Sequence, residues 1–380
     1  MTAVSVFHRP ELARRLTDRI LDNSPTSASR SGIFLVAPRR TGLSTFIRAD
    51  LLPALERREV VVISIPLSAD PRIDPGEMIA KGVRSALGKR ETAVKRTTTS
   101  LGIADDSVGS INFSLERIGI GKDVTLTQTL AALSEEVKCL VVIVIDDVQQ
   151  VLSSQAGMDS LFALKAARDE LNSSAHSGLR LVFSGTHGGK LAMLRGSVDQ
   201  AFYGAPLVAL PHLNRDYVER FCANISLPGA LEPDAVWGLF EKAGWQPERL
   251  DVAADQLRLN IEGTPAYLQS RFAAAVEEQI MMATTEILHT LQTLTELQTA
   301  VLRVFAESGT DYHPFEATTF TRYHAALAEV SSSANAEIDI PSTLAALRGL
   351  EEGSLIWTTS RGVYEWEDPT VAEVLLECPS

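Results

Sequence analysis

The chain has 380 residues, of which 45% are hydrophobic and 22% charged, an ordinary globular composition that allows two or three domains. No run approaches the roughly 18 apolar residues of a membrane span, the N-terminus lacks the apolar stretch of a secretory signal, and Cys139, Cys222 and Cys378 show no C-x-x-C spacing. These features argue against a membrane protein, a disulfide framework and a zinc site. We expect a cytoplasmic protein.

The net charge of −13 is unevenly distributed along the chain. Residues 1–100 hold 17 Lys and Arg against 10 Asp and Glu, whereas residues 286–380 hold 15 acidic residues, four arginines and no lysine. Binding to a polyanion depends on Lys and Arg, so we do not expect the C-terminal part to bind one.

Strand-like segments recur in the first 210 residues, and several are continuously apolar, which is typical of parallel strands buried on both faces. They cover residues 33–37, 60–65, 140–145, 179–183 and 207–210. Helical patterns lie between them, at residues 44–58 and 159–171. The alternation predicts an α/β fold with helices covering a parallel sheet over about residues 30–212. Pro53 is expected to kink the first helix.

The rest of the chain has a different pattern. Residues 85–124 are rich in Lys, Arg, Thr, Ser and Gly, and predict a surface excursion with a short hairpin. After Pro211, helical patterns dominate to about residue 285. Helices are then predicted at 296–308, 317–330 and 341–353, followed by a strand pair over 355–367 that turns at 360–362. Three helices and a hairpin indicate a winged helix.

The stretch LVAPRRTGLST, residues 35–45, nearly matches the phosphate-binding pattern G-x-x-x-x-G-K-[ST]. Gly42, Ser44 and Thr45 are in place, but Leu43 stands where the lysine belongs and Ala37 where the first glycine belongs. In such a loop, backbone N–H groups and the start of the next helix hold the phosphates. The lysine neutralises the β and γ phosphates, and the hydroxyl after it, here that of Ser44, binds magnesium.

The sequence therefore predicts a backbone cradle without its cation, with Leu43 at the mouth of the cleft. Its residues are Arg39, Arg40, Thr41, Gly42, Leu43, Ser44 and Thr45. A charged hydrogen bond contributes about 1.5–3 kcal/mol, so its loss should weaken ATP binding roughly ten- to a hundredfold. Hydrolysis should fall by roughly 10² to 10³. Arg39 or Arg40 could replace the lysine in part, or the stretch could be a plain strand, turn and helix without a ligand.

An acidic strand end follows about 100 residues later, in CLVVIVIDDVQQ, residues 139–150. A carboxylate at the carboxyl edge of a parallel sheet lies where ligands bind. Asp146 would hold magnesium through water, and Asp147 would activate the attacking water. The alternative is that the two aspartates only cap the following helix.

Together, the loop, the acidic strand end and the layout resemble the AAA+ superfamily, specifically the bacterial and archaeal ATPases allied to origin-recognition and STAND proteins. FHRPELARRL, residues 7–16, looks like the family's N-terminal motif, which leads towards the adenine pocket. LRLVFSGTHGGKLAML, residues 179–194, looks like the sensor-1 strand and makes Thr186 the sensor residue. GWQPERL, residues 244–250, resembles the lid's G-x-P element, so Pro247 would face the base and ribose, with Pro265 as a poorer candidate.

The resemblance implies an AAA+ core over residues 1–212, a helical lid over 213–285 and a winged-helix domain over 286–380, with ATP or ADP and Mg²⁺ as ligands. Two departures fall on the chemistry: Leu43 replaces the lysine of the now degenerate Walker A motif, and Asp147 replaces the usual glutamate. We therefore favour a regulatory or scaffolding subunit with weak or absent nucleotide binding and little or no hydrolysis. The alternatives are a slow ATPase rescued by an arginine from the loop or a neighbouring subunit, and a DNA-associated, initiator-like protein.

The predicted winged helix is acidic, which argues against DNA binding through it. Its third helix offers Arg348 beside Glu351 and Glu352, so we expect it to contact protein instead. The better place for nucleic acid is the basic N-terminal third, whose candidates are Arg14, Arg15, Arg57, Arg58, Lys89, Arg90, Lys95 and Arg96. The opposite charges of the two ends would favour head-to-tail assembly into a homo- or hetero-oligomer.

Overall fold

The computed structural model describes residues 6–24, 26–70, 72–86, 125–173, 177–227, 229–259, 265–330, 338–360 and 362–377. The chain divides into two compact units, Met1–His212 and Leu213–Ser380, and each has an apolar core of its own. Within the described ranges, no helix combines the length and the apolar character needed to span a membrane. The hairpin expected within residues 85–124 falls almost wholly outside the described residues.

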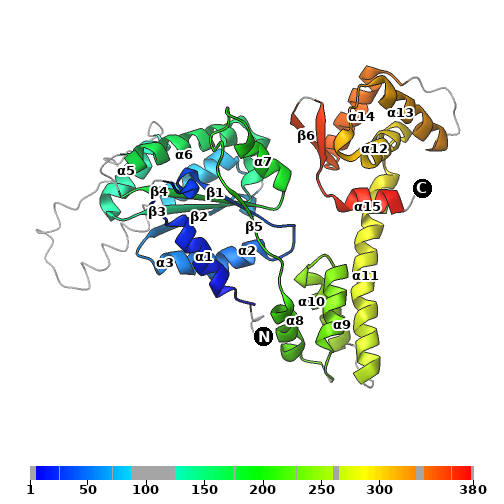
Figure 1. The fold of residues 1–380 in the computed structure, drawn as a ribbon, viewed down its shortest axis with the longest axis horizontal. Helices are drawn as coiled ribbons and strands as arrows, with labels where there is room; N and C mark the ends of the chain where they lie inside the picture. Colours follow the sequence, from blue (N-terminus) through cyan, green and yellow to red (C-terminus); the bar gives the residue numbers. More distant parts are fainter. Residues whose placement is uncertain are drawn as a thin grey trace, which may run out of the picture. The chain divides into compact units, whose positions relative to one another are not determined.

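The first unit is built on a five-stranded sheet with strand order β2-β3-β4-β1-β5 (Figure 1). The strands are β1 (Ile33–Val36), β2 (Val61–Pro66), β3 (Val141–Asp146), β4 (Leu179–Gly185) and β5 (Leu207–Ala209). Each pairs in parallel with its neighbours. The five predicted strands and the parallel α/β sheet are thus confirmed.

Helices cover both faces of this sheet (Figure 1). One face carries α1 (Pro10–Ile20), α2 (Leu43–Phe46) and α3 (Leu52–Glu56), and the other carries α5 (Leu126–Val137), α6 (Gln155–Ser173), α7 (Gly188–Gly196) and a helix over residues 75–86. Side chains of β3 alternate between the two cores: Val142 and Val144 join the α1 side, whereas Val141, Ile143 and Ile145 join the α6 side. Burial on both faces explains the continuous apolar run in the sequence.

Pro53, where the sequence predicts a kink, is preceded by a π-helical turn, η2 (Ile47–Leu51), between α2 and α3. The Leu52 N–H donates to the Ile47 carbonyl, one residue further back than in an α-helix. Proline has no N–H to donate, and its ring crowds the carbonyl four residues earlier. The wider turn relieves that crowding, so the helical path continues from Leu43 to Glu56.

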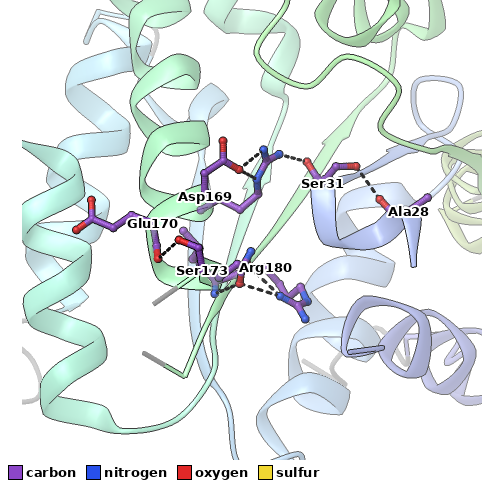
Figure 2. Close-up of polar contacts among 9 residues, drawn as sticks. Ala28, Ser31, Asp169, Glu170, Ser173 and Arg180 are labelled. Carbon is purple, nitrogen blue, oxygen red and sulfur yellow. Dashed lines mark hydrogen bonds and ion pairs between the residues drawn. The ribbon is translucent and has the colours of Figure 1, made fainter. Parts of the chain in front are cut away.

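Two buried arginines fasten α6 to the amino ends of β1 and β4 (Figure 2). Arg168 donates to the Ser31 carbonyl oxygen at 2.5 Å. Asn172 exchanges hydrogen bonds with the Leu179 backbone and accepts a third from Arg180 at 3.1 Å. Burial lowers the pKa of the Arg180 guanidinium. These polar contacts hold the edge of the sheet opposite the strand carboxyl ends.

The second unit is mostly helical. Its elements are α8 (Arg215–Asn224), α9 (Pro233–Lys242), α10 (Pro247–Leu259), α11 (Pro265–Gln292), α12 (Glu296–Ser308), α13 (Ala317–Val330), α14 (Ile340–Glu352), the antiparallel pair β6 (Ile356–Ser360) and β7 (Val363–Trp366), and α15 (Thr370–Glu377). The three helices and hairpin predicted after residue 295 are confirmed. Helix α15 was not predicted, although it buries Val371, Val374 and Leu375 at helical spacing.

Helix α11 is 28 residues long and crosses the boundary expected between residues 285 and 286. One continuous helix therefore connects the lid-like helices α8 to α10 with the winged-helix elements that follow. The division of the second unit into two domains stays a prediction.

Candidate nucleotide-binding site

The predicted site residues of the first unit lie at one edge of its sheet. The register pairs Ile145 of β3 with Phe183 of β4, and Val36 of β1 with Gly185 of β4. Hence the loop after β1, the aspartates that end β3 and the predicted sensor threonine after β4 all begin at the same edge. In open α/β sheets this carboxyl edge is where ligands bind.

The loop between β1 and α2 has the backbone shape of a turn into a helix. Arg40 and Gly42 have φ angles of +63° and +90°. A Cβ on Gly42 would meet no atom within 4 Å, so glycine is favoured there by the left-handed backbone and not by lack of space. The Thr41 hydroxyl donates to the Pro38 carbonyl at 2.7 Å, and the Phe46 N–H donates to the Gly42 carbonyl at 2.9 Å.

Leu43 is the first residue of α2, and its side chain is only 4% exposed. It belongs to the apolar cluster that joins α1 to β1 and β3, together with Leu16 and Leu35. The expectation that Leu43 lies at the mouth of the cleft is therefore wrong. Full burial of a leucine side chain contributes about 1.5–3 kcal/mol, which draws it into the core.

Of the other loop side chains, Thr41 is buried, and the rest lie at or near the surface. Arg39, Arg40 and Thr45 are exposed, and Ser44 is half-buried at the start of α2. A bound phosphate would thus meet backbone N–H groups, hydroxyls and exposed arginine side chains, but no side chain at position 43. Replacement of the lysine by either arginine stays a prediction.

Asp146 ends β3 as a buried carboxylate, 8% exposed. Its Oδ1 accepts a hydrogen bond from the fully buried Ser184 hydroxyl at 2.6 Å and another from the Asp147 backbone N–H at 3.2 Å. Charge-assisted bonds of this kind fix the orientation of a carboxylate, and Oδ2 stays outside both. Sequence reasoning missed Ser184, although a polar residue near the end of an apolar strand was its signal.

Asp147 directly precedes the 3₁₀ helix η5 (Val148–Ser153) and has a φ of +58°. Its side chain makes no capping hydrogen bond, so the alternative in which this aspartate caps the next helix is not supported. Instead it accepts from Gln149 Nε2 at 3.2 Å. Gln149 in turn lies over Gly185, where an added Cβ would come 2.1 Å from Gln149 Oε1. Gly185 therefore leaves the space that Gln149 occupies.

Thr186 directly follows β4 and is half-buried at the same edge. The next residue, His187, is 8% exposed, and its Nδ1 accepts from the Lys190 backbone N–H at 3.3 Å at the start of α7. This capping contact gives His187 a structural role. Pro247 and Pro265 begin α10 and α11 in the second unit, so their approach to a nucleotide stays a prediction.

Within the described ranges, no group of three or more His, Cys, Asp or Glu side chains is arranged to hold a metal ion. Magnesium keeps most of its ligands as water and phosphate oxygens and needs only one or two protein groups. An oriented carboxylate at Asp146 and a hydroxyl at Ser44 fit that requirement. The chain's own residues thus suit a magnesium ion that arrives with a nucleotide.

No protein-family model matches the sequence, and no curated protein does either. Solved structures do match in fold. The Aeropyrum pernix ORC2 protein in its ADP form aligns with a TM-score of 0.60 at 13% identity, covering 99% of this chain and 96% of that one. The chain is similar in fold to the AAA+ proteins of the Orc1/Cdc6 type. At this identity the likeness concerns the fold alone, including the helical lid and the C-terminal winged helix.

Two further solved structures align over a similar share of both chains. The same ORC2 protein in ADPNP-ADP complexes aligns with a TM-score of 0.53 at 14% identity, covering 98% of this chain and 94% of that one. The Aeropyrum pernix ORC1 protein in complex with DNA aligns at 0.45 and 16%, with the same coverage of 98% and 94%.

Proposed function

We propose that the protein is an AAA+-like regulatory or scaffolding subunit that binds adenine nucleotide weakly and hydrolyses it negligibly. The observation that carries this proposal is the contrast within the loop. Its backbone turns through a left-handed Gly42 into a helix, whereas residue 43 is an aliphatic side chain packed into the core. Solved structures of similar fold that are named for ADP and ADPNP support the nucleotide class.

Different groups of the site would bind the phosphates and the magnesium ion. Backbone N–H groups of residues 40–44 would hold the phosphates, and Ser44 and Asp146 would hold magnesium directly or through water. Magnesium, when bound, neutralises phosphate charge. Without a lysine, the loop supplies no fixed cation for the β and γ phosphates, which should weaken binding roughly ten- to a hundredfold. Asp147, one methylene shorter than glutamate, would position water poorly.

Titration calorimetry of the full chain with ADP and ATP, with and without Mg²⁺, tests the proposal. We expect binding that is weak and strengthened by magnesium. Asp146→Asn keeps an oxygen for Ser184 but loses the charge, so it should remove most of the magnesium effect. Asp159→Asn, an exposed carboxylate on α6, is the matched control. The absence of any heat of binding at about 1 mM nucleotide would refute nucleotide binding.

A slow ATPase is the second candidate, favoured by the state of the acidic strand end. The Ser184 hydroxyl donates to Asp146 Oδ1 at 2.6 Å, and Gln149 Nε2 donates to Asp147 Oδ1 at 3.2 Å. These bonds orient both carboxylates. A site with both carboxylates held in place retains the parts for magnesium and water. An arginine from the loop or a neighbouring subunit would then supply the missing positive charge. Measurable phosphate release that depends on Arg39 or Arg40 would favour this candidate.

DNA association is the third possibility, and it rests on the fold, which does not determine function. Two arginines of the predicted basic patch are paired with acids: Arg14 with Glu11 and Asp18, and Arg58 with Asp18. The candidates from Lys89 to Arg96 lie outside the described residues. Fluorescence anisotropy with duplex DNA at low and high salt would test this role, and strong salt-sensitive binding would support it.

A further inference from the structure

The N-terminal segment is fastened to the helical path that follows the phosphate-binding loop. The His8 ring Nδ1 lies 2.8 Å from Asp50 Oδ1, and the Arg9 backbone N–H donates to Asp50 Oδ2 at 3.0 Å. Asp50 is 6% exposed and lies in the π-helical turn η2. Two successive residues thus occupy the two oxygens of one buried carboxylate.

The Arg9 side chain extends this attachment to two other places. Its guanidinium lies over the Phe46 ring at the end of α2, 4.7 Å from the ring centroid. Its NH1 group donates to the Pro211 carbonyl oxygen at 2.9 Å. Burial lowers the pKa of this guanidinium, and the charge of Asp50 opposes that shift. Arg9 is therefore partly desolvated, which strengthens its attraction to the Phe46 ring.

Pro211 lies where the chain leaves the sheet of the first unit. Leu210 continues the pairing of β5, because its N–H donates to the Val36 carbonyl at 2.8 Å. Pro211 follows directly, and the first unit ends one residue later, at His212. The segment that carries the chain into the second unit is thus bound by the same side chain that packs on the helix after the loop.

We infer that Arg9 is a latch that couples the helix following the phosphate-binding loop to the connector leading into the second unit. A shift of α2 or η2 moves Phe46 and Asp50. Because Arg9 contacts both residues and the Pro211 carbonyl oxygen, the shift also displaces Pro211. A shift of the connector acts on the loop helix by the same contacts. The coupling needs no nucleotide, so it stands whether or not the proposed function holds.

Hydrogen exchange of the nucleotide-free full chain, read by mass spectrometry, tests the latch. Arg9→Ala should speed exchange roughly ten- to a hundredfold both in residues 46–52 and in residues 207–213. Arg15→Ala removes an exposed arginine from the middle of α1 and should leave both segments unchanged. Arg9→Lys keeps the charge but loses the planar group, so it should give a smaller rise in the same two segments.

The outcomes are distinct. A rise confined to residues 6–12, or an equal rise in Arg15→Ala, would overturn the inference. Circular dichroism of each variant shows whether it is folded. If Arg9→Ala does not fold, Arg9→Lys carries the test, and unchanged exchange of residues 207–213 in that variant would refute the latch.

Discussion

The loop after β1 and the acidic end of β3 lie at the same edge of one sheet, and each would supply a different part of the proposed nucleotide site. The loop keeps its backbone shape, but position 43 is apolar and buried. The strand end keeps an acidic residue, and the Ser184 hydroxyl donates to Asp146 at 2.6 Å. The comparison teaches that the backbone turn into α2 forms with an apolar residue at position 43, since glycine and helix geometry do not depend on that side chain.

The largest effect on stability is expected from Leu43→Ala, which tests whether the Leu43 side chain of the loop is part of the apolar core. Deleting a buried leucine side chain should lower the free energy of unfolding by about 2–5 kcal/mol. Chemical denaturation of the full chain measures it. Leu207→Ala, at a β5 position that is 36% exposed, should cost less than half as much. Equal losses in the two variants would show that Leu43 is not packed as described.

Ser184→Ala tests the contact of Ser184 with Asp146 at the acidic end of β3. The variant deprives a buried carboxylate of a hydrogen bond, which should cost about 1–3 kcal/mol of unfolding free energy. Ser64→Ala, an exposed serine on β2, is the control and should change stability by less than about 0.5 kcal/mol. If Ser184→Ala is neutral in denaturation, the carboxylate does not depend on this partner.

Gly42→Ala separates backbone shape from side-chain packing in the loop. An alanine at a φ of +90° is strained, so the variant should lose about 1–2 kcal/mol of stability and bind nucleotide more weakly. Gly196→Ala is a suitable control, because an added Cβ there also meets no atom within 4 Å and its φ is not positive. Thermal unfolding compares the two. A loss shared by Gly196→Ala would mean that the left-handed turn is not the cause.

The smallest effect is expected from Arg39→Ala and Arg40→Ala. Both side chains are exposed, and each should change the dissociation constant for ATP by no more than about threefold, or about 0.6 kcal/mol. Calorimetry with Mg·ATP measures this. A tenfold weakening in either variant would show that an arginine has taken the place of the lysine, and would favour the slow-ATPase candidate.

Much of the first unit could be predicted because its signals are local. Apolar runs such as VVIVID mark strands buried on both faces, and the loop pattern marks the turn into α2. Pairing partners across the sheet are not local signals, so the contacts of Ser184 with Asp146, 38 residues earlier, were missed. The attachment of His8 and Arg9 to Asp50 spans about 42 residues and was missed for the same reason.

The direction of the Leu43 side chain was mispredicted for a different reason. The prediction placed Leu43 where the lysine of the motif would lie. The direction of a side chain depends on its own chemistry instead. Lysine would keep its charge in solvent or on a phosphate, but leucine joins the nearest apolar cluster, formed with Leu16 and Leu35. Helix α15 was missed because its eight residues follow a hairpin with little punctuation besides Asp368 and Pro369.

The rate of phosphate release from Mg·ATP, measured for the natural chain, Leu43→Lys and Leu43→Met, tests the missing cation most directly. The account predicts negligible release by the natural chain, tighter ATP binding by roughly ten- to a hundredfold in Leu43→Lys, and a faster rate in that variant only. Leu43→Met, of similar volume and without charge, should match the natural chain. An ordinary ATPase rate in the natural chain, with no gain from Leu43→Lys, would contradict the account.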